Sequence, residues 1–182
     1  MNKVDLSKYD NSWYNPGGVL KRASWHMVSI LFFKCSLPFP SGFKKFLLTL
    51  FGAKVGNGVV IKPCVNIKYP WFLTIGDNVW IGEEVWIDNL ADVILGDNVC
   101  LSQGAFLLTG NHNYKKETFD LITGPITIED GVWVGAKAVV CPGIKLGSHS
   151  VVSVGSVVTK DTEGYGIYRG VPAELVGKRV IN

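Results

Sequence analysis

The stretch from residue 128 to residue 163 can be written in steps of six: Ile128-Glu-Asp-Gly-Val-Trp, Val134-Gly-Ala-Lys-Ala-Val, Val140-Cys-Pro-Gly-Ile-Lys, Leu146-Gly-Ser-His-Ser-Val, Val152-Ser-Val-Gly-Ser-Val and Val158-Thr-Lys-Asp-Thr-Glu. An aliphatic residue opens all six steps, and most fifth positions hold a small residue or valine. A period of six matches neither an α-helix nor a simple amphipathic strand. This hexapeptide repeat is typical of a parallel β-helix.

The repeat predicts a triangular coil of about 18 residues, with three short strands in each turn. The aliphatic residues that open each step are expected to point inward and to stack on their equivalents at the inter-strand spacing of ~4.8 Å. Glycines such as Gly131, Gly143 and Gly155 permit the positive φ angles that tight corners require.

Composition limits the remaining choices. The 182 residues suit one domain, or one domain with an appendage. The net charge of +3, without any basic run, argues against a nucleic-acid partner. The four cysteines are dispersed and include no C-x-x-C pair, so neither a zinc cluster nor a disulfide framework is expected. We therefore expect a cytoplasmic protein without a signal peptide.

The N-terminal segment, residues 1–54, has a different character from the repeats. It begins with a polar arm and continues with two apolar blocks between Leu20 and Gly52, each of which predicts a short helix. Neither block approaches the ~20 apolar residues of a membrane span. Two compatible roles remain: the helices cap the open end of the solenoid, which we favour, or they contact the membrane surface at the inner face of the bilayer.

Residues 55–163 carry the repeats, interrupted by an aperiodic loop at 108–125, and residues 164–182 are expected to form a C-terminal tail. Loops on a rigid scaffold often carry function, and this one contains His112. Of the other two histidines, His26 is expected to pack in the apolar segment, and His149 to face outward from a regular repeat.

Several motifs together resemble one family over nearly everything after residue 15. They are the run from Phe46 to Gly56, Lys68-Tyr-Pro-Trp, Thr109-Gly-Asn-His, Gly131-Val-Trp-Val-Gly and Arg169-Gly-Val-Pro-Ala. The chain resembles the hexapeptide-repeat acyltransferases, in the branch of galactoside, maltose and xenobiotic acetyltransferases, and especially the colanic acid biosynthesis acetyltransferases. This resemblance implies an all-β, left-handed parallel β-helix with a short helical N-terminal segment.

The resemblance also implies a reaction. His112 matches the loop histidine that acts as general base in the family, so it is expected to take the proton from a sugar hydroxyl that attacks acetyl-CoA. No metal is implied, and a homotrimer with sites between subunits is expected. The residues expected to line the acetyl-CoA groove are Trp133, Gly135, Ala136, Val154, Gly155, Thr159, Lys160, Arg169, Lys178 and Arg179.

The acceptor is expected beside the loop, as a sugar or oligosaccharide that is free or lipid-linked. The candidate acceptor-binding residues are Glu84, Asp88, Asn89, Asn111 and Tyr114. The chain departs from the family near its end. Val171 replaces the usual asparagine, and Glu174 and Gly177 stand where galactoside acetyltransferases have arginines.

Other functions fit less well. A γ-type carbonic anhydrase needs three zinc-binding histidines, and the repeats hold only two candidates, His112 and His149. A sugar-nucleotide uridylyltransferase needs a nucleotide-binding domain, for which the residues before the first repeat are too few. Two alternatives stay open: an acyltransferase for another small acceptor, such as a serine-like amino acid or a xenobiotic alcohol, and a non-catalytic membrane-docking module.

Overall fold

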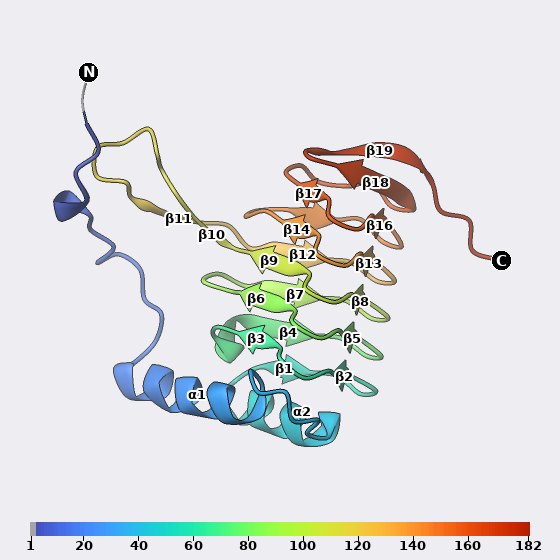
Figure 1. Cartoon of the computed structure of the whole chain (residues 1–182), viewed down its shortest axis with the longest axis horizontal. Coiled ribbons are helices and arrows are strands. Elements are labelled where there is room, and N and C mark those ends of the chain that lie inside the picture. The colour runs from blue at the N-terminus through green and yellow to red at the C-terminus, as the bar shows by residue number, and fades with distance from the viewer. Residues whose placement is uncertain (1–2) are drawn as a thin grey trace.

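The computed structural model describes residues 3–182, which form a three-sided parallel β-solenoid with two helices across one end (Figure 1). The first face contains β1 (Lys54–Val55), β4 (Leu73–Ile75), β7 (Val93–Leu95), β12 (Ile126–Ile128) and β15 (Lys145–Leu146). The second face contains β2 (Val60–Ile61), β5 (Trp80–Ile81), β8 (Cys100–Leu101), β13 (Trp133–Val134), β16 (Val151–Val152), β18 (Gly166–Gly170) and β19 (Ala173–Lys178). The third face contains β3 (Asn66–Ile67), β6 (Trp86–Asp88), β9 (Phe106–Leu108), β14 (Val139–Val140) and β17 (Val157–Val158).

The hexapeptide pattern accounts for the core. The residues that open the repeats, such as Val134, Val140 and Leu146, are fully buried. Three polar residues at fifth positions, Ser150, Ser156 and Thr162, are also buried, and the hydroxyls of Ser150 and Thr162 lie 3.2 Å apart. The inward stacking expected from the repeat is therefore confirmed.

Coil length differs between the two halves of the solenoid. In the second half Thr127 pairs with Lys145, 18 residues further on, as the repeat predicts. In the first half Lys54 pairs with Thr74 and Trp80 with Cys100, so these coils contain 20 residues. The extra residues lie at the corner between the third and first faces, which we call the hairpin corner.

Two helices close the N-terminal end, α1 (Val19–Phe32) and α2 (Ser41–Leu50). Trp25 is 2% exposed, and its indole nitrogen donates a 2.9 Å hydrogen bond to the Ile67 carbonyl. Lys44 is also buried, and its ammonium donates a 2.8 Å hydrogen bond to the Lys62 carbonyl in the first coil. Burial lowers the pKa of this ammonium. The expected capping role is confirmed, and in residues 3–182 neither helix has the length and apolarity to cross a bilayer.

Two segments differ from the sequence-based expectation. The aperiodic interruption is an antiparallel hairpin of β10 (Gly110–His112) and β11 (Leu121–Thr123) rather than an irregular loop. We call residues 109–124 the hairpin. The last residues are not a simple tail, because β18 and β19 pair antiparallel and extend the second face.

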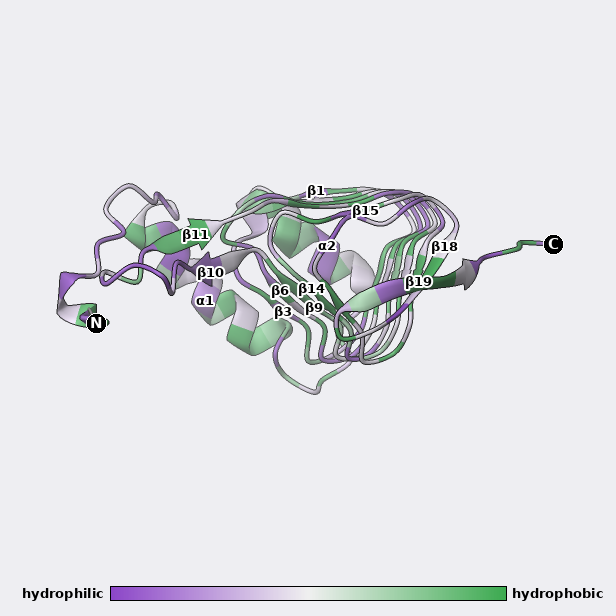
Figure 2. Ribbon diagram, turned by 90° about the horizontal axis from the view of Figure 1, so that it is seen from above, coloured by the Kyte–Doolittle hydropathy of each residue, from purple (hydrophilic) through white to green (hydrophobic). Residues whose placement is uncertain are grey.

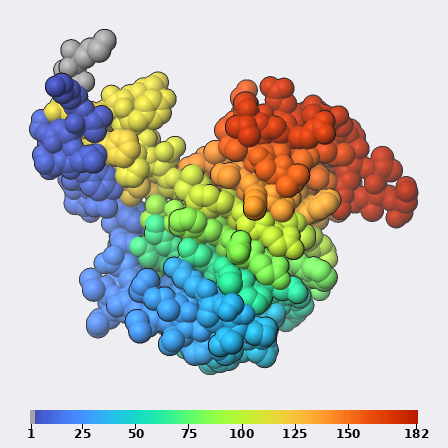
Figure 3. Space-filling model, viewed as in Figure 1, coloured from blue at the N-terminus to red at the C-terminus, as the bar shows by residue number. Residues whose placement is uncertain are grey.

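The polar arm, residues 3–18, reaches back along the hairpin (Figure 3). The arm contains a short 3-10 turn, η1 (Leu6–Lys8). Another 3-10 turn, η2 (Pro70–Phe72), lies in the solenoid at the hairpin corner. The Asp5 amide donates a 2.9 Å hydrogen bond to the Glu117 carbonyl at the tip of the hairpin. Further along the arm, the Tyr14 hydroxyl donates a 2.8 Å hydrogen bond to the Leu90 carbonyl.

The close stacking of the coils makes a stability prediction. A Cβ at Gly147 would lie 2.6 Å from the Gly164 amide nitrogen and 2.7 Å from the Thr162 carbonyl oxygen, both in backbone. Gly147→Ala should therefore lower the free energy of unfolding by about 1–3 kcal/mol. Gly42→Ala is the control, because its Cβ would meet nothing within 4 Å and alanine favours the helix. Thermal and urea unfolding measure both variants, and equal effects would contradict the packing argument.

Candidate functional site

The hairpin is anchored where it leaves the solenoid. The Thr109 hydroxyl donates a 2.8 Å hydrogen bond to the Asp88 carbonyl one coil below and accepts one of 3.1 Å from the Ala91 amide. The Gly124 amide then donates to the Thr109 carbonyl at 2.9 Å, which closes the base of the hairpin. At its outer half, Lys116 pairs with Asp120 at 2.8 Å, and this hydrogen bond lowers the pKa of the Asp120 carboxyl.

His112 ends β10 and is held in one orientation. Its Nδ1 lies 2.9 Å from the Phe119 carbonyl oxygen. Because a carbonyl can only accept, Nδ1 carries the proton in the neutral ring, and Nε2 keeps its lone pair. The Phe119 ring stacks on the imidazole, with a centroid separation of 4.4 Å and an interplanar angle of 8°. The arrangement leaves Nε2 as the nitrogen able to accept a proton.

Phe119 is a positioning residue that the sequence did not reveal. It adopts a left-handed backbone conformation with φ of 53°, which is uncommon for an aromatic residue. In this conformation both the carbonyl and the ring of Phe119 contact His112. Tyr9 of the arm adds a third contact, with its ring 5.7 Å from the imidazole. Neither residue belongs to a periodic pattern, so no sequence signal was available.

The candidate acceptor residues divide into two groups. Asp88 lies on the third face at the hairpin corner, is 9% exposed and forms an ion pair with Lys68 at 2.8 Å. Asn111 and Tyr114 lie on the hairpin beside His112, and the Asn111 side chain accepts a hydrogen bond from the His112 amide at 2.8 Å. The structure therefore brings these three near the histidine-bearing corner.

The other two candidates lie elsewhere or are already occupied. The Asn89 side chain is fully buried, where it accepts from the Tyr69 amide at 3.0 Å and donates to the Tyr69 carbonyl at 2.6 Å. These two bonds use its amide to hold the corner together. Glu84 is exposed in the turn between β5 and β6, which belongs to a different corner of the coil. We leave both out of the acceptor site.

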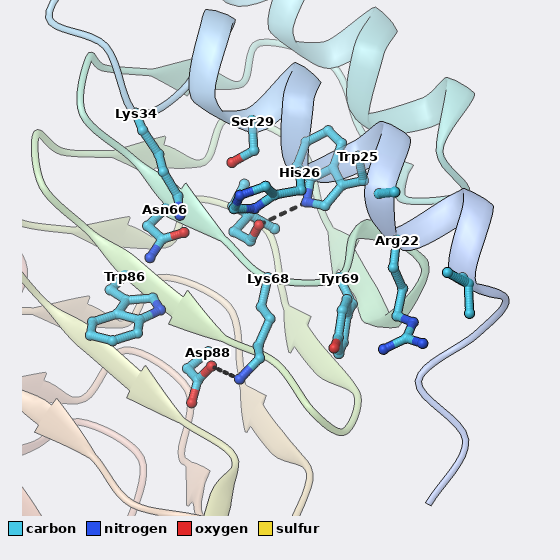
Figure 4. Close-up of a pocket in the computed structure, with 13 residues that line it drawn as sticks. Arg22, Trp25, His26, Ser29, Lys34, Asn66, Lys68, Tyr69, Trp86 and Asp88 are labelled. Atoms are coloured by element: carbon cyan, nitrogen blue, oxygen red, sulfur yellow. Dashed lines mark hydrogen bonds and ion pairs between the residues drawn. The ribbon is translucent and has the colours of Figure 1, made fainter.

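An open cavity of about 520 Å³ lies between α1 and the third face, next to Asp88 (Figure 4). His26 lines this cavity from α1 and is exposed, so its expected role as a packed residue is wrong. His149, in contrast, is half-buried and stacks on Tyr165 with centroids 4.8 Å apart. Within residues 3–182, no cluster of three or more His, Cys, Asp or Glu side chains suits a metal ion.

The candidate acetyl-CoA residues on the C-terminal coils, which follow the hairpin, lie away from His112. Trp133 is 47% exposed on the second face, and its indole nitrogen donates to the Ser102 hydroxyl at 2.9 Å. Gly135 is buried in the following turn, where a Cβ would lie 2.7 Å from the Val152 carbonyl oxygen. Four further candidates have exposed or half-buried positions at the turns after β13, β16 and β17: Ala136, Val154, Gly155 and Thr159.

The cationic candidates are dispersed. Lys160 and Arg169 are exposed, whereas Lys178 pairs with Glu163 at 3.0 Å. Arg179 donates a 2.8 Å hydrogen bond to the Gly131 carbonyl and so fixes the C-terminal segment. The hairpin projects from one side of the solenoid, whereas β13, β16 and the C-terminal strands lie toward the other (Figures 1 and 2). One chain therefore does not bring the histidine together with most of the groove candidates.

Fold and site together define a hexapeptide-repeat solenoid that presents an oriented imidazole on a hairpin. The family model described as "Hexapeptide repeat of succinyl-transferase" matches residues 73–108 and 125–160, on either side of the hairpin. The Escherichia coli (strain K12) protein named "Putative colanic acid biosynthesis acetyltransferase WcaF" is 35% identical over 167 residues, which cover 92% of each chain. The chain belongs to the hexapeptide-repeat acetyltransferase family.

Two solved structures share the fold. The Vibrio cholerae hexapeptide-repeat acetyltransferase VCA0836, complexed with acetyl coenzyme A, has a TM-score of 0.78, 23% identity and 87% coverage of both chains. A galactoside acetyltransferase in complex with coenzyme A has a TM-score of 0.78 and 28% identity, covering 87% of this chain and 80% of the other. The expected left-handed β-helix is confirmed by these comparisons.

Proposed function

We propose that this acetyltransferase moves an acetyl group from acetyl-CoA to a sugar hydroxyl during synthesis of a surface polysaccharide. Acetyl-CoA is the co-substrate, in keeping with the relatives solved with acetyl-CoA and CoA. The polysaccharide context follows the name of the WcaF relative. The observation that carries the proposal is the His112–Phe119 hydrogen bond, because it leaves Nε2 available on a projecting hairpin.

The reaction follows from this orientation. An alcohol is a poor nucleophile until its proton is removed, and a neutral imidazole is well matched to that task. Nε2 of His112 takes the hydroxyl proton as the sugar oxygen attacks the thioester carbonyl. When the tetrahedral intermediate collapses, the acetyl ester forms, the C–S bond breaks, and the proton passes from Nε2 to the CoA thiolate.

The distribution of candidates supports a site shared between subunits. In one chain the hairpin, which carries His112, projects from one side of the solenoid, whereas β13, which contains Trp133, and β16, which precedes Val154, lie toward the other side (Figure 1). Closed cyclic oligomers commonly place such separated elements against each other. In a homotrimer, the hairpin of one protomer would face the upper coils of its neighbour. Each of three equivalent sites would then contain one imidazole and one acetyl-CoA groove.

The acceptor prediction can be tested by product analysis. The protein is incubated with acetyl-CoA and a panel of surface-polysaccharide repeat units, simple glycosides, serine and a xenobiotic alcohol, and the products are separated and weighed by mass spectrometry. We expect an acetyl ester on a glycan and free CoA in equal amounts. Transfer only to serine or the xenobiotic alcohol would overturn the sugar assignment, and absence of any product would overturn the reaction.

A further inference from the structure

The cavity beneath α1 has an unusual balance of charge. Arg22 and Lys34 line it from the N-terminal segment, and Lys68 lines it from the third-face side. Asp88 is the only acidic residue in its lining, and its charge is already balanced by Lys68 at 2.8 Å. Within the described part of the chain, Arg22 in α1 and Lys34 just after it have no ion pair, so the cavity keeps two uncompensated cations.

Among residues 3–182, two hydrogen-bond donors in the cavity wall have no acceptor, and the Asp88 Oδ1 atom has only its ion pair with Lys68. Ser29 is 2% exposed, and its hydroxyl makes no hydrogen bond to any described residue. The Nε atom of Arg22 is also buried without an acceptor. Buried polar groups are normally satisfied, and an unsatisfied one costs free energy. Both unpartnered groups can donate hydrogen bonds, so a ligand that supplies acceptor oxygens would complete them.

The surrounding sequence has the same character. Residues 11–76 contain eight lysines and arginines and no aspartate or glutamate, while all 15 acidic residues lie elsewhere in the chain. This charge asymmetry favours an anion at the N-terminal end of the solenoid. The walls of the cavity also hold the aromatic side chains of Trp25, Tyr69 and Trp86, and Trp86 is 43% exposed (Figure 4). Such surfaces suit the apolar face of a sugar ring.

The cavity lies on the histidine-bearing side of the molecule. Asp88, at its edge, pairs in register with Leu108, the last residue of β9 before the hairpin. The Thr109 hydroxyl also donates to the Asp88 carbonyl. A ligand held between α1 and Asp88 would therefore extend from the basic cavity toward the hairpin.

We propose that this cavity binds the phosphate or diphosphate group of a glycosyl phosphate, so that the acceptor sugar is presented to the hairpin while it is still attached to its carrier. The proposal rests on the proposed function for the identity of the sugar. Arg22 and Lys34 pair with the phosphate oxygens, Ser29 donates to one of them, and Asp88 accepts from a sugar hydroxyl. Charge-assisted hydrogen bonds of this kind are among the strongest that proteins make to phosphate.

The carrier has two sources, a membrane lipid or a nucleotide. The outer surface of α1 favours the lipid, because Leu20 is 87% exposed, Met27 58% and Leu31 54%. The exposed apolar residues continue onto α2 with Phe46 and Leu50, at 60% and 66%. Apolar side chains combined with lysine and arginine suit an anionic bilayer surface.

The test is to titrate the full chain with inorganic pyrophosphate and to measure the binding affinity by isothermal titration calorimetry. Arg22→Gln and Lys34→Gln should each weaken binding by about 10-fold. The control is Lys54→Gln, because Lys54 is exposed on the first face outside the cavity lining. Absence of pyrophosphate binding by the wild type, or equal weakening by Lys54→Gln, would overturn the site.

A second measurement identifies the carrier. The protein is sedimented with phosphatidylglycerol vesicles and with phosphatidylcholine vesicles, beside a Leu20→Ser/Leu31→Ser variant. Binding to phosphatidylglycerol that this variant loses indicates a lipid carrier, whereas pyrophosphate binding without vesicle binding indicates a nucleotide carrier. Neither measurement needs turnover. Failure of the phosphate site is thus distinct from inactivity on the glycan panel, which tests the proposed function.

Discussion

Replacing His112 with glutamine is expected to lower kcat by about 10²–10⁴-fold, because the reaction loses its general base while the hairpin keeps its shape. Glutamine is polar and close to histidine in length, but its amide takes the place of Nε2 rather than of Nδ1, which lies 2.9 Å from the Phe119 carbonyl oxygen, and the amide is not basic. Binding of acetyl-CoA should be unchanged, since the base acts on the acceptor. Steady-state assays of CoA release, with calorimetry for acetyl-CoA affinity, separate the two effects.

The matched control is His149→Gln. His149 is also half-buried and stacked on an aromatic ring, but it lies in a regular turn on the upper coils. Its replacement should leave kcat within a few-fold of the wild type. Phe119→Leu provides an intermediate case, because it removes the stacked ring and retains the backbone carbonyl. Equal turnover by His112→Gln and the wild type would contradict the assignment of the base.

The second large effect is a recovery of activity by mixing two inactive proteins. Val154→Trp should block the acetyl-CoA groove without harming the fold, because the Val154 side chain is 71% exposed. His112→Gln lacks the base but keeps its groove. If each site takes its hairpin and its groove from different protomers, co-refolding equal amounts should restore roughly a quarter of the sites.

The recovery experiment needs a mass measurement and one further control. Light scattering should report a trimer for each variant and for the mixture. A double variant, His112→Gln/Val154→Trp, mixed with His112→Gln should stay inactive, because no chain then supplies a base. Activity that never exceeds the sum of the two separate proteins would show that hairpin and groove act within one chain, and would remove the shared site.

The sequence predicted the scaffold better than the site. A six-residue period is repeated many times, so chance substitutions do not hide it, and burial of Val134 and Leu146 follows directly. Positions of contact between distant segments carry no such repetition. Tyr9 meets His112 across more than 100 residues of chain, and Phe119 acts partly through its backbone carbonyl. Neither contact leaves a periodic trace.

The acceptor candidates show the same limit. Asp88 and Asn89 are adjacent in sequence and equally polar, yet one faces the cavity and the other is buried under two hydrogen bonds. Alternation along a strand predicts that the two side chains point to opposite faces, but at a corner it does not show which of them faces the cavity. His26 was misassigned for a related reason, because apolar neighbours in α1 did not reveal which side of the helix faces the cavity.

The longer coils of the first half have a consequence for how such enzymes diversify. Apart from the antiparallel pairs β10–β11 and β18–β19, each described strand pairs only with its equivalents in the neighbouring coils, so residues gained or lost at the hairpin corner leave all three faces in register. Residues can therefore be added at the hairpin corner, beside the proposed acceptor site, without changing the strands of the coils. The 18-residue coils of the second half would not be altered by such changes.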